Sequence, residues 1–149
     1  MIFQDEFLKL NIIDNIPLGN ISKSDIHGHG LFAKQVIPKN STLCKLDGQI
    51  ILWNDYEQIV SYFEPKLKDL KDYFFMEWNA LSVDILLVRA LRTKYSYINH
   101  SRTPNVKILK ESMTIISIVD ILPNDEILLD YRDEPLNERY LNGHGKTYL

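Results

Sequence analysis

The sequence predicts one domain of mainly β, α+β class, because of where its apolar segments fall. Short apolar runs separated by turn residues fill 19–52 and return over 105–130, whereas the block between them has helical character. Strands and helices do not alternate regularly, which argues against a doubly wound parallel sheet. The length of 149 residues is that of a single domain with its own core.

Local patterns predict the individual elements. Strand-like runs are expected at 31–33, 36–37, 42–52, 105–109, 113–121 and 126–130. A helix should begin at Asn54 or Asp55, either of which can cap it, and Pro65 should end or restart it. A second helix is expected over 84–92, where apolar residues recur at helical spacing. Residues 3–13 place apolar side chains near one side of a short helix, and we interpret 1–18 as a docking arm.

Charge and hydropathy exclude several classes of protein. A formal net charge of −3 argues against direct nucleic-acid binding, which depends on clustered Lys and Arg, and suits a basic partner. The apolar runs fall short of the roughly 18 residues that cross a bilayer, so no membrane partner is expected. The N-terminus, with Asp5 and Glu6, does not look like an export signal. We expect an intracellular protein, cytoplasmic or nuclear, and in a host cell if it is viral or an effector.

No metal site is expected. Cys44 is the single cysteine, so it can form neither an internal disulfide nor a thiolate-rich zinc site. Leu43 and Leu46 around it favour a buried strand residue over a nucleophile. The four histidines do not follow a metal-ligand spacing.

Three short clusters carry the chemical interest of the sequence. Gly28-His29-Gly30 allows unusual backbone angles and a close approach of a ligand to the main chain, although a tight turn is the simpler interpretation. Asn99-His100-Ser101, with Pro104-Asn105 after it, can stabilise a polar corner. Asp130-Tyr131 ends a strand-like run. Each cluster taken singly has a purely structural explanation.

Taken together, the clusters resemble the SET methyltransferase family, which couples G-x-G-[LV]-F-A, N-H-S-x-x-P-N and a terminal D-Y in this order. The resemblance covers roughly 21–131. It implies small, mostly antiparallel sheets with a helical insert at about 55–80 and a pseudoknotted, knot-like C-terminal segment, a threading rare among folds. The SET domain would span 19–131, and the tail 132–149 would close the substrate channel.

The resemblance also implies an activity, the methylation of a protein lysine by S-adenosylmethionine (S-adenosyl-L-methionine). Gly28, His29 and Gly30 would line the methionine end of the cofactor. Asn99 and His100 would lie against it, His100 through its main chain at the adenine. Tyr131 matches the catalytic tyrosine that orients the amine. The lysine, with an ordinary pKa of about 10.4, would lose its proton through burial and the nearby sulfonium charge.

The sequence departs from the family in the lysine half of the site. Leu46 replaces a tyrosine found in many members, and Tyr97 and Tyr140 are expected to line the channel instead, with Tyr95 and Tyr148 as further candidates. Leu129, two residues before Tyr131, lacks a hydroxyl, so we expect more than one methyl to be added.

Arg102 replaces the cysteine that commonly follows N-H-S, and no Cys-rich zinc segment follows Tyr131. Compact viral or bacterial members share this feature, and those of viral type act as dimers, so a homodimer is expected here. The substrate would be a histone tail or another basic protein. An alternative is a catalytically inactive SET domain that binds a peptide or protein, which the missing tyrosine at position 46 favours.

Overall fold

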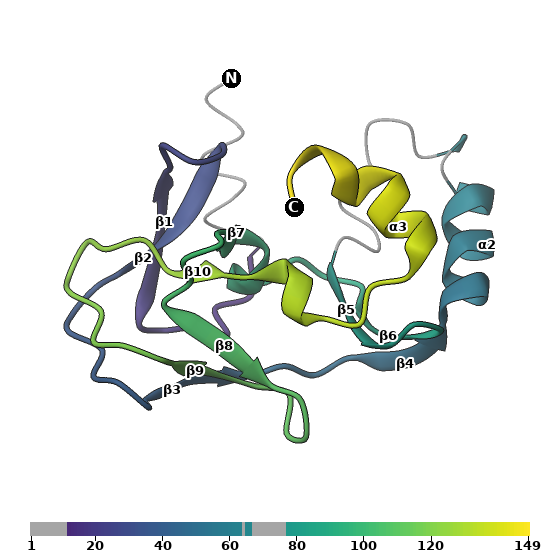
Figure 1. Ribbon diagram of the computed structural model, residues 1–149. Helices are drawn as coiled ribbons and strands as arrows, with labels where there is room; N and C mark the ends of the chain where they lie inside the picture. The colour runs from purple at the N-terminus through teal and green to yellow at the C-terminus, as the bar shows by residue number, and fades with distance from the viewer. Residues whose placement is uncertain (1–11, 64, 67–76) are drawn as a thin grey trace.

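The computed structural model describes residues 12–63, 65–66 and 77–149 (Figure 1). Within these residues the strands form four small sheets. The N-terminal hairpin pairs β1 (Gly19–Lys23) with β2 (His29–Ala33). A second sheet has the order β3-β9-β8, from Thr42–Lys45, Thr114–Ser117 and Val106–Leu109. A third has the order β4-β6-β5, from Gln49–Leu52, Ile85–Arg89 and Glu77–Ser82. All these pairings are antiparallel, as expected.

The fourth sheet brings distant parts of the chain together in parallel. β7 (Asn99–His100) pairs with β10 (Leu128–Leu129). The segment that leads into β10 is also hydrogen-bonded to β2, because Ile127 N–H donates to the Leu31 carbonyl at 2.7 Å. The segment before Tyr131 therefore lies between the glycine-bearing hairpin and the Asn-His strand, as Figure 1 also shows.

The remaining elements are helical. α2 (Trp53–Phe63) follows β4 directly, and its start is fixed by a bond from Trp53 N–H to the Asp84 carbonyl at 2.9 Å. The predicted capping residues Asn54 and Asp55 lie inside its first turn. Short helices complete the chain: η2 (Lys94–Tyr97), η3 (Tyr131–Asp133), α3 (Glu138–Asn142) and η4 (His144–Thr147). No helix in the described ranges is long and apolar enough to cross a membrane.

In the described part of the chain, two hydrophobic cores hold the sheets together. The larger one joins the hairpin, the β3-β9-β8 sheet and the segment before Tyr131, and it contains fully buried Leu31, Val106 and Ile127. The smaller one lies between the β4-β6-β5 sheet, α2 and the tail, around Trp53 and Leu86. Burying such side chains contributes about 1.5–3 kcal/mol each. The tail is thus packed on the insert.

The helix predicted over 84–92 is wrong, because its apolar residues form β6 instead. β6 is the central strand of its sheet, and Leu86, Leu87, Val88 and Arg89 are all buried. A strand covered on both faces shows a continuous apolar run, which periodicity cannot distinguish from a helix. The insert at 55–80 likewise ends in strand β5, and its residues 64 and 67–76 lie outside the described residues.

Other predicted strands are shorter than expected. The run 42–52 is split into β3 and β4 at Gly48, whose φ is 144° and whose added Cβ would lie 2.6 Å from the Val88 carbonyl oxygen. Residues 36–37 form no strand, and Ile37 makes only a single bridge to Ile121. Of the proposed docking arm, residues 1–11 lie outside the described residues, and the described part contains fully buried Ile16. The arm stays a prediction.

Candidate functional site

The glycine-bearing turn is shaped by two different constraints. Gly28 has a φ of 50°, in the left-handed region that favours glycine, and a Cβ added there would meet nothing within 4 Å. Gly30 lies against a side chain instead, and its added Cβ would come within 2.1 Å of Glu126 Oε1. The turn therefore has an open main chain at Gly28 and a close internal contact at Gly30.

Asn99 ties this turn to the parallel sheet. Its Nδ2 donates to Glu126 Oε1 at 2.7 Å and lies 3.2 Å and 3.3 Å from the carbonyl oxygens of His27 and His29. The Glu126 carboxylate also accepts from Ser24 Oγ at 2.8 Å and 2.9 Å. Because Asn99 is buried, these bonds fix the turn relative to β7. The structure thus brings together Gly28, His29, Gly30 and Asn99 as the sequence predicted.

His100 contacts the predicted catalytic residue through its ring. The main-chain N–H of Tyr131 donates to His100 Nδ1 at 3.1 Å, so Nδ1 carries a lone pair and the ring proton is on Nε2. Asp130 Oδ1 is 3.8 Å from the same nitrogen, but the Asp130 carboxylate is held by Arg132 at 2.5 Å and 2.8 Å. The hydrogen bonds from Arg132 lower the pKa of Asp130 to about 2. Asp130 is therefore ionised at neutral pH.

Tyr131 begins η3 and its hydroxyl is turned into the fold. The hydroxyl donates to the main-chain carbonyl of Ile98. Burial, followed by the nearby Tyr148 and Glu134, raises the pKa of Tyr131 well above its ordinary value. The side chain is a neutral phenol at physiological pH, and its oxygen keeps lone pairs for a further contact.

The residues predicted for the substrate channel lie in different places. Leu129 is 2% exposed and lines a pocket with Ala80, Ile108, Met113 and Glu134. Tyr97 is buried in the larger core, and its hydroxyl accepts from Arg92 at 2.9 Å. Leu46 is buried in the same core and contributes no polar group.

Tyr140 belongs to an aromatic series in the tail. Its ring is 5.0 Å from Trp78 and 6.4 Å from Tyr148, and Tyr148 is in turn 6.3 Å from Tyr131. Arg102, in the loop after β7, donates to the Leu149 carbonyl at 3.1 Å. The tail thus packs against the ring of Tyr131. Within the described ranges, no group of three or more His, Cys, Asp or Glu that could hold a metal ion occurs.

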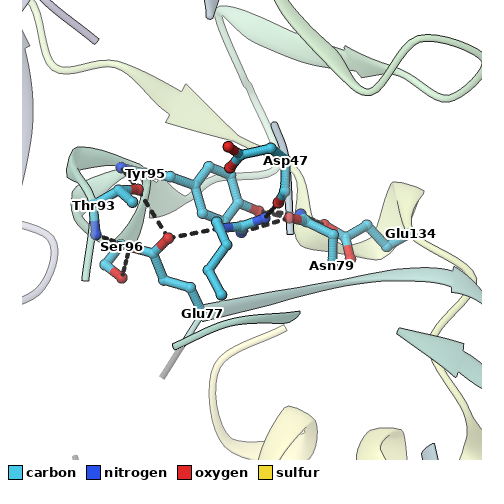
Figure 2. Close-up of polar contacts among 8 residues, drawn as sticks. Asp47, Glu77, Asn79, Thr93, Tyr95, Ser96 and Glu134 are labelled. Atoms are coloured by element: carbon cyan, nitrogen blue, oxygen red, sulfur yellow. Dashed lines mark hydrogen bonds and ion pairs between the residues drawn. The ribbon is translucent and has the colours of Figure 1, made fainter. Parts of the chain in front are cut away.

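Sequence reasoning missed a buried polar network beside this site (Figure 2). Arg89 donates to Glu77 at 2.8 Å, to Asn79 at 2.7 Å and to the Asp47 carbonyl at 2.9 Å. The Asn79 amide extends the network, because its Nδ2 donates to the Tyr95 hydroxyl and to Glu134 Oε1. Of these residues the sequence marks Tyr95 alone, as a candidate for the channel. Glu134 and Asn79 carry no such signal, because they are 55 positions apart and meet only through tertiary packing.

Comparison with protein families gives a match that covers most of the chain. The sequence model of the SET domain matches residues 28–132, from the first glycine of the turn to the residue after Tyr131. No curated protein matches the chain closely enough to be compared with it.

Proposed function

We propose that this chain, which belongs to the SET domain family, transfers a methyl group from S-adenosylmethionine to the ε-amine of a lysine in a protein substrate. SET domains are typically protein lysine methyltransferases and generally use this cofactor. The observation that carries the proposal is the setting of Tyr131, a neutral phenol anchored to the Ile98 carbonyl and to the His100 ring.

The described residues fit the cofactor. The main chain at Gly28 is open to a ligand, and Asn99 holds the carbonyls of His27 and His29 beside it. Gly28, His29 and Gly30 with Asn99 and His100 would therefore bind it, and it supplies an electrophilic methyl group when bound. Orientation by such a preformed turn reduces the entropy cost of the reaction.

Tyr131 would act as the catalytic residue by orienting the amine. Its hydroxyl hydrogen is occupied by the Ile98 carbonyl, so toward a substrate the oxygen acts as an acceptor of N–H groups. An amine whose N–H groups are accepted from one side presents its lone pair to the other. The raised pKa of Tyr131 supports this role over that of a phenolate base.

The substrate half would be formed by Leu129 and the tail. Leu129 offers no hydroxyl that would restrict methylation, which supports the addition of more than one methyl. The packing of Tyr148 and Tyr140 near Tyr131 supports closure of the channel by 132–149 within one chain. A histone tail or another basic protein remains our proposed substrate, and a homodimer our proposed assembly.

Tyr131→Phe tests the proposal, with methyl transfer measured on a histone mixture and a lysine peptide array. We expect Tyr131→Phe to lower kcat by about 10²-fold or more, the scale of a lost transition-state hydrogen bond in a preorganised site, while binding of S-adenosylhomocysteine is kept. Tyr62→Phe is the matched control, because Tyr62 is 62% exposed on α2. Cofactor binding without transfer by the wild type would instead favour the inactive, peptide-binding alternative, which Leu46 supports.

A further inference from the structure

Glu134, in the tail three residues after Tyr131, contacts strand β5 of the β4-β6-β5 sheet. Its Oε2 accepts the main-chain N–H of Ala80 at 2.7 Å, and its Oε1 accepts Asn79 Nδ2 at 2.7 Å and the Tyr95 hydroxyl at 3.3 Å. Figure 2 shows the Asn79 and Glu134 side chains side by side at the end of the network. A partly buried carboxylate with three donors has a fixed position.

Among the described residues, no cationic side chain forms a direct ion pair with the Glu134 carboxylate. The Arg89 guanidinium forms its ion pair with Glu77 and reaches Glu134 only through the Asn79 amide. A partly buried carboxylate in this condition has a strong affinity for a cation or a proton.

The acceptor positions of Glu134 and Tyr95 are incompletely used. A carboxylate offers about four acceptor positions, and three donors reach Glu134. The Tyr95 hydroxyl accepts from Asn79 at 2.8 Å and donates to Glu134, which leaves its oxygen one lone pair. Glu134 also lines the pocket of Leu129, where Ala80, Ile108 and Met113 are apolar. An alkyl chain that ends in N–H donors complements the apolar wall of this pocket and the unused acceptor position of Glu134.

We propose that Glu134 is a catalytic residue that accepts the proton of the substrate lysine, an inference that rests on the proposed function. One N–H bond of the ammonium breaks and its electron pair stays on nitrogen, while the proton forms an O–H bond with a Glu134 oxygen. An ammonium and a carboxylate become a neutral amine and a neutral acid. The acid later returns the proton to water. The amine thus gains the free lone pair that methyl transfer requires.

The surroundings favour this direction of transfer. Burial raises the pKa of Glu134 above its ordinary value, and burial of an ammonium lowers the pKa of the lysine, so both shifts move the proton from nitrogen to oxygen. Asp130 cannot substitute, because Arg132 holds its pKa at about 2. The other charged or titratable groups that face Glu134 or share its pocket are Arg89 on β6, Tyr95 on η2, Tyr131 on η3, and Lys110 and Asp133 in the pocket wall.

The first test reads the protonation of Glu134 directly. The Cδ carbon of Glu134 is followed by ¹³C NMR in the wild-type complex with S-adenosylhomocysteine during addition of n-butylamine, which carries the end of a lysine side chain. We expect the Glu134 signal to move toward the protonated acid at constant pH, while that of exposed Glu138 stays unchanged. An unchanged Glu134 signal at every n-butylamine concentration overturns the proposal, and this test needs no variant.

The second test is a pH profile of methyl transfer to the array peptide for the wild type, Glu134→Gln and the control Glu138→Gln. Loss of a general base costs on the order of 10²–10⁴-fold in rate, so we expect Glu134→Gln to lose at least 10²-fold in kcat near neutral pH. The loss should shrink as the pH rises, because solvent then deprotonates the lysine. A parallel loss at every pH would mark a structural role and overturn the proposal. If the folded wild type does not bind S-adenosylhomocysteine, the proposed function itself is overturned.

Discussion

Nδ1 of His100 accepts the main-chain N–H of Tyr131 at 3.1 Å, so the Asn-His motif and the proposed catalytic tyrosine share a direct hydrogen bond. The bond joins residues 31 positions apart, across the parallel pairing of β7 with β10. The side chain of His100 therefore positions Tyr131, while its main chain is proposed to contact the cofactor.

Replacing this ring tests that relationship. His100→Ala leaves the Tyr131 N–H without its partner, and an unsatisfied buried donor costs about 1–3 kcal/mol. We expect kcat to fall at least tenfold and S-adenosylhomocysteine to bind nearly as before, measured by methyl transfer and calorimetry. His144→Ala, at an exposed position in the tail, is the control. Wild-type kcat in His100→Ala would show that the bond is dispensable.

Gly30→Ala should disrupt the glycine-bearing turn. The added Cβ would lie 2.1 Å from Glu126 Oε1, and Glu126 cannot move without breaking its bonds to Ser24 and Asn99. Overpacking of this kind costs about 1–3 kcal/mol, which urea unfolding would measure, and cofactor binding should weaken as well. In Gly28→Ala the added Cβ meets no neighbouring atom. The loss of stability should therefore be only the cost of placing alanine at a φ of 50°, about 1–2 kcal/mol. Equal stability of Gly30→Ala and wild type would contradict the account of the turn.

The Asp130–Arg132 contact predicts how stability depends on acid. The pKa of Asp130 is lowered in the folded state from 3.8 to about 2, so its contribution is present above pH 3.8 and is lost as the pH falls toward 2. The free energy of unfolding of wild type and Asp130→Asn, measured from neutral pH downward, should differ above this window and converge through it. Because Arg132 is largely exposed, high salt should reduce the difference. If the two free energies of unfolding still differed by the same amount near pH 2, the ionisation of Asp130 could not be the cause of the difference.

Cys44 should be unreactive in the folded protein. Burial raises its pKa to about 11, so at pH 8 almost no thiolate is present. Labelling with a thiol reagent should be slow in the native state and rapid in denaturant, measured by mass spectrometry. Rapid native labelling would show that β3 opens readily.

Much of the candidate site could be predicted from the sequence, because its motifs are local. The turn at 28–30, the Asn99-His100 pair and Tyr131 are short segments whose residue types define their chemistry. The buried strand that holds Cys44 was also predicted and is confirmed as β3. Helix α2 could be predicted from the capping residues near its start and from Pro65 after its end.

The central strand of the β4-β6-β5 sheet and most of the polar network could not be predicted. β6 is buried on both faces, so its apolar run carries no two-residue alternation to mark a strand. Glu134 looks like one more charged residue of a polar tail, and only the packing of that tail against β5 gives it Asn79 and Ala80 as donors. The part of the proposed site around the lysine therefore depends on tertiary contacts that the sequence does not encode locally.

Calorimetric titration with S-adenosylhomocysteine tests the central claim most directly. We expect one site per chain in the wild type and at least tenfold weaker binding in Asn99→Ala, because loss of the Asn99 amide frees the turn and leaves Glu126 short of a donor. Asn142→Ala, in the exposed tail, should bind like wild type. An absence of binding to the folded wild-type protein would contradict the methyltransferase assignment.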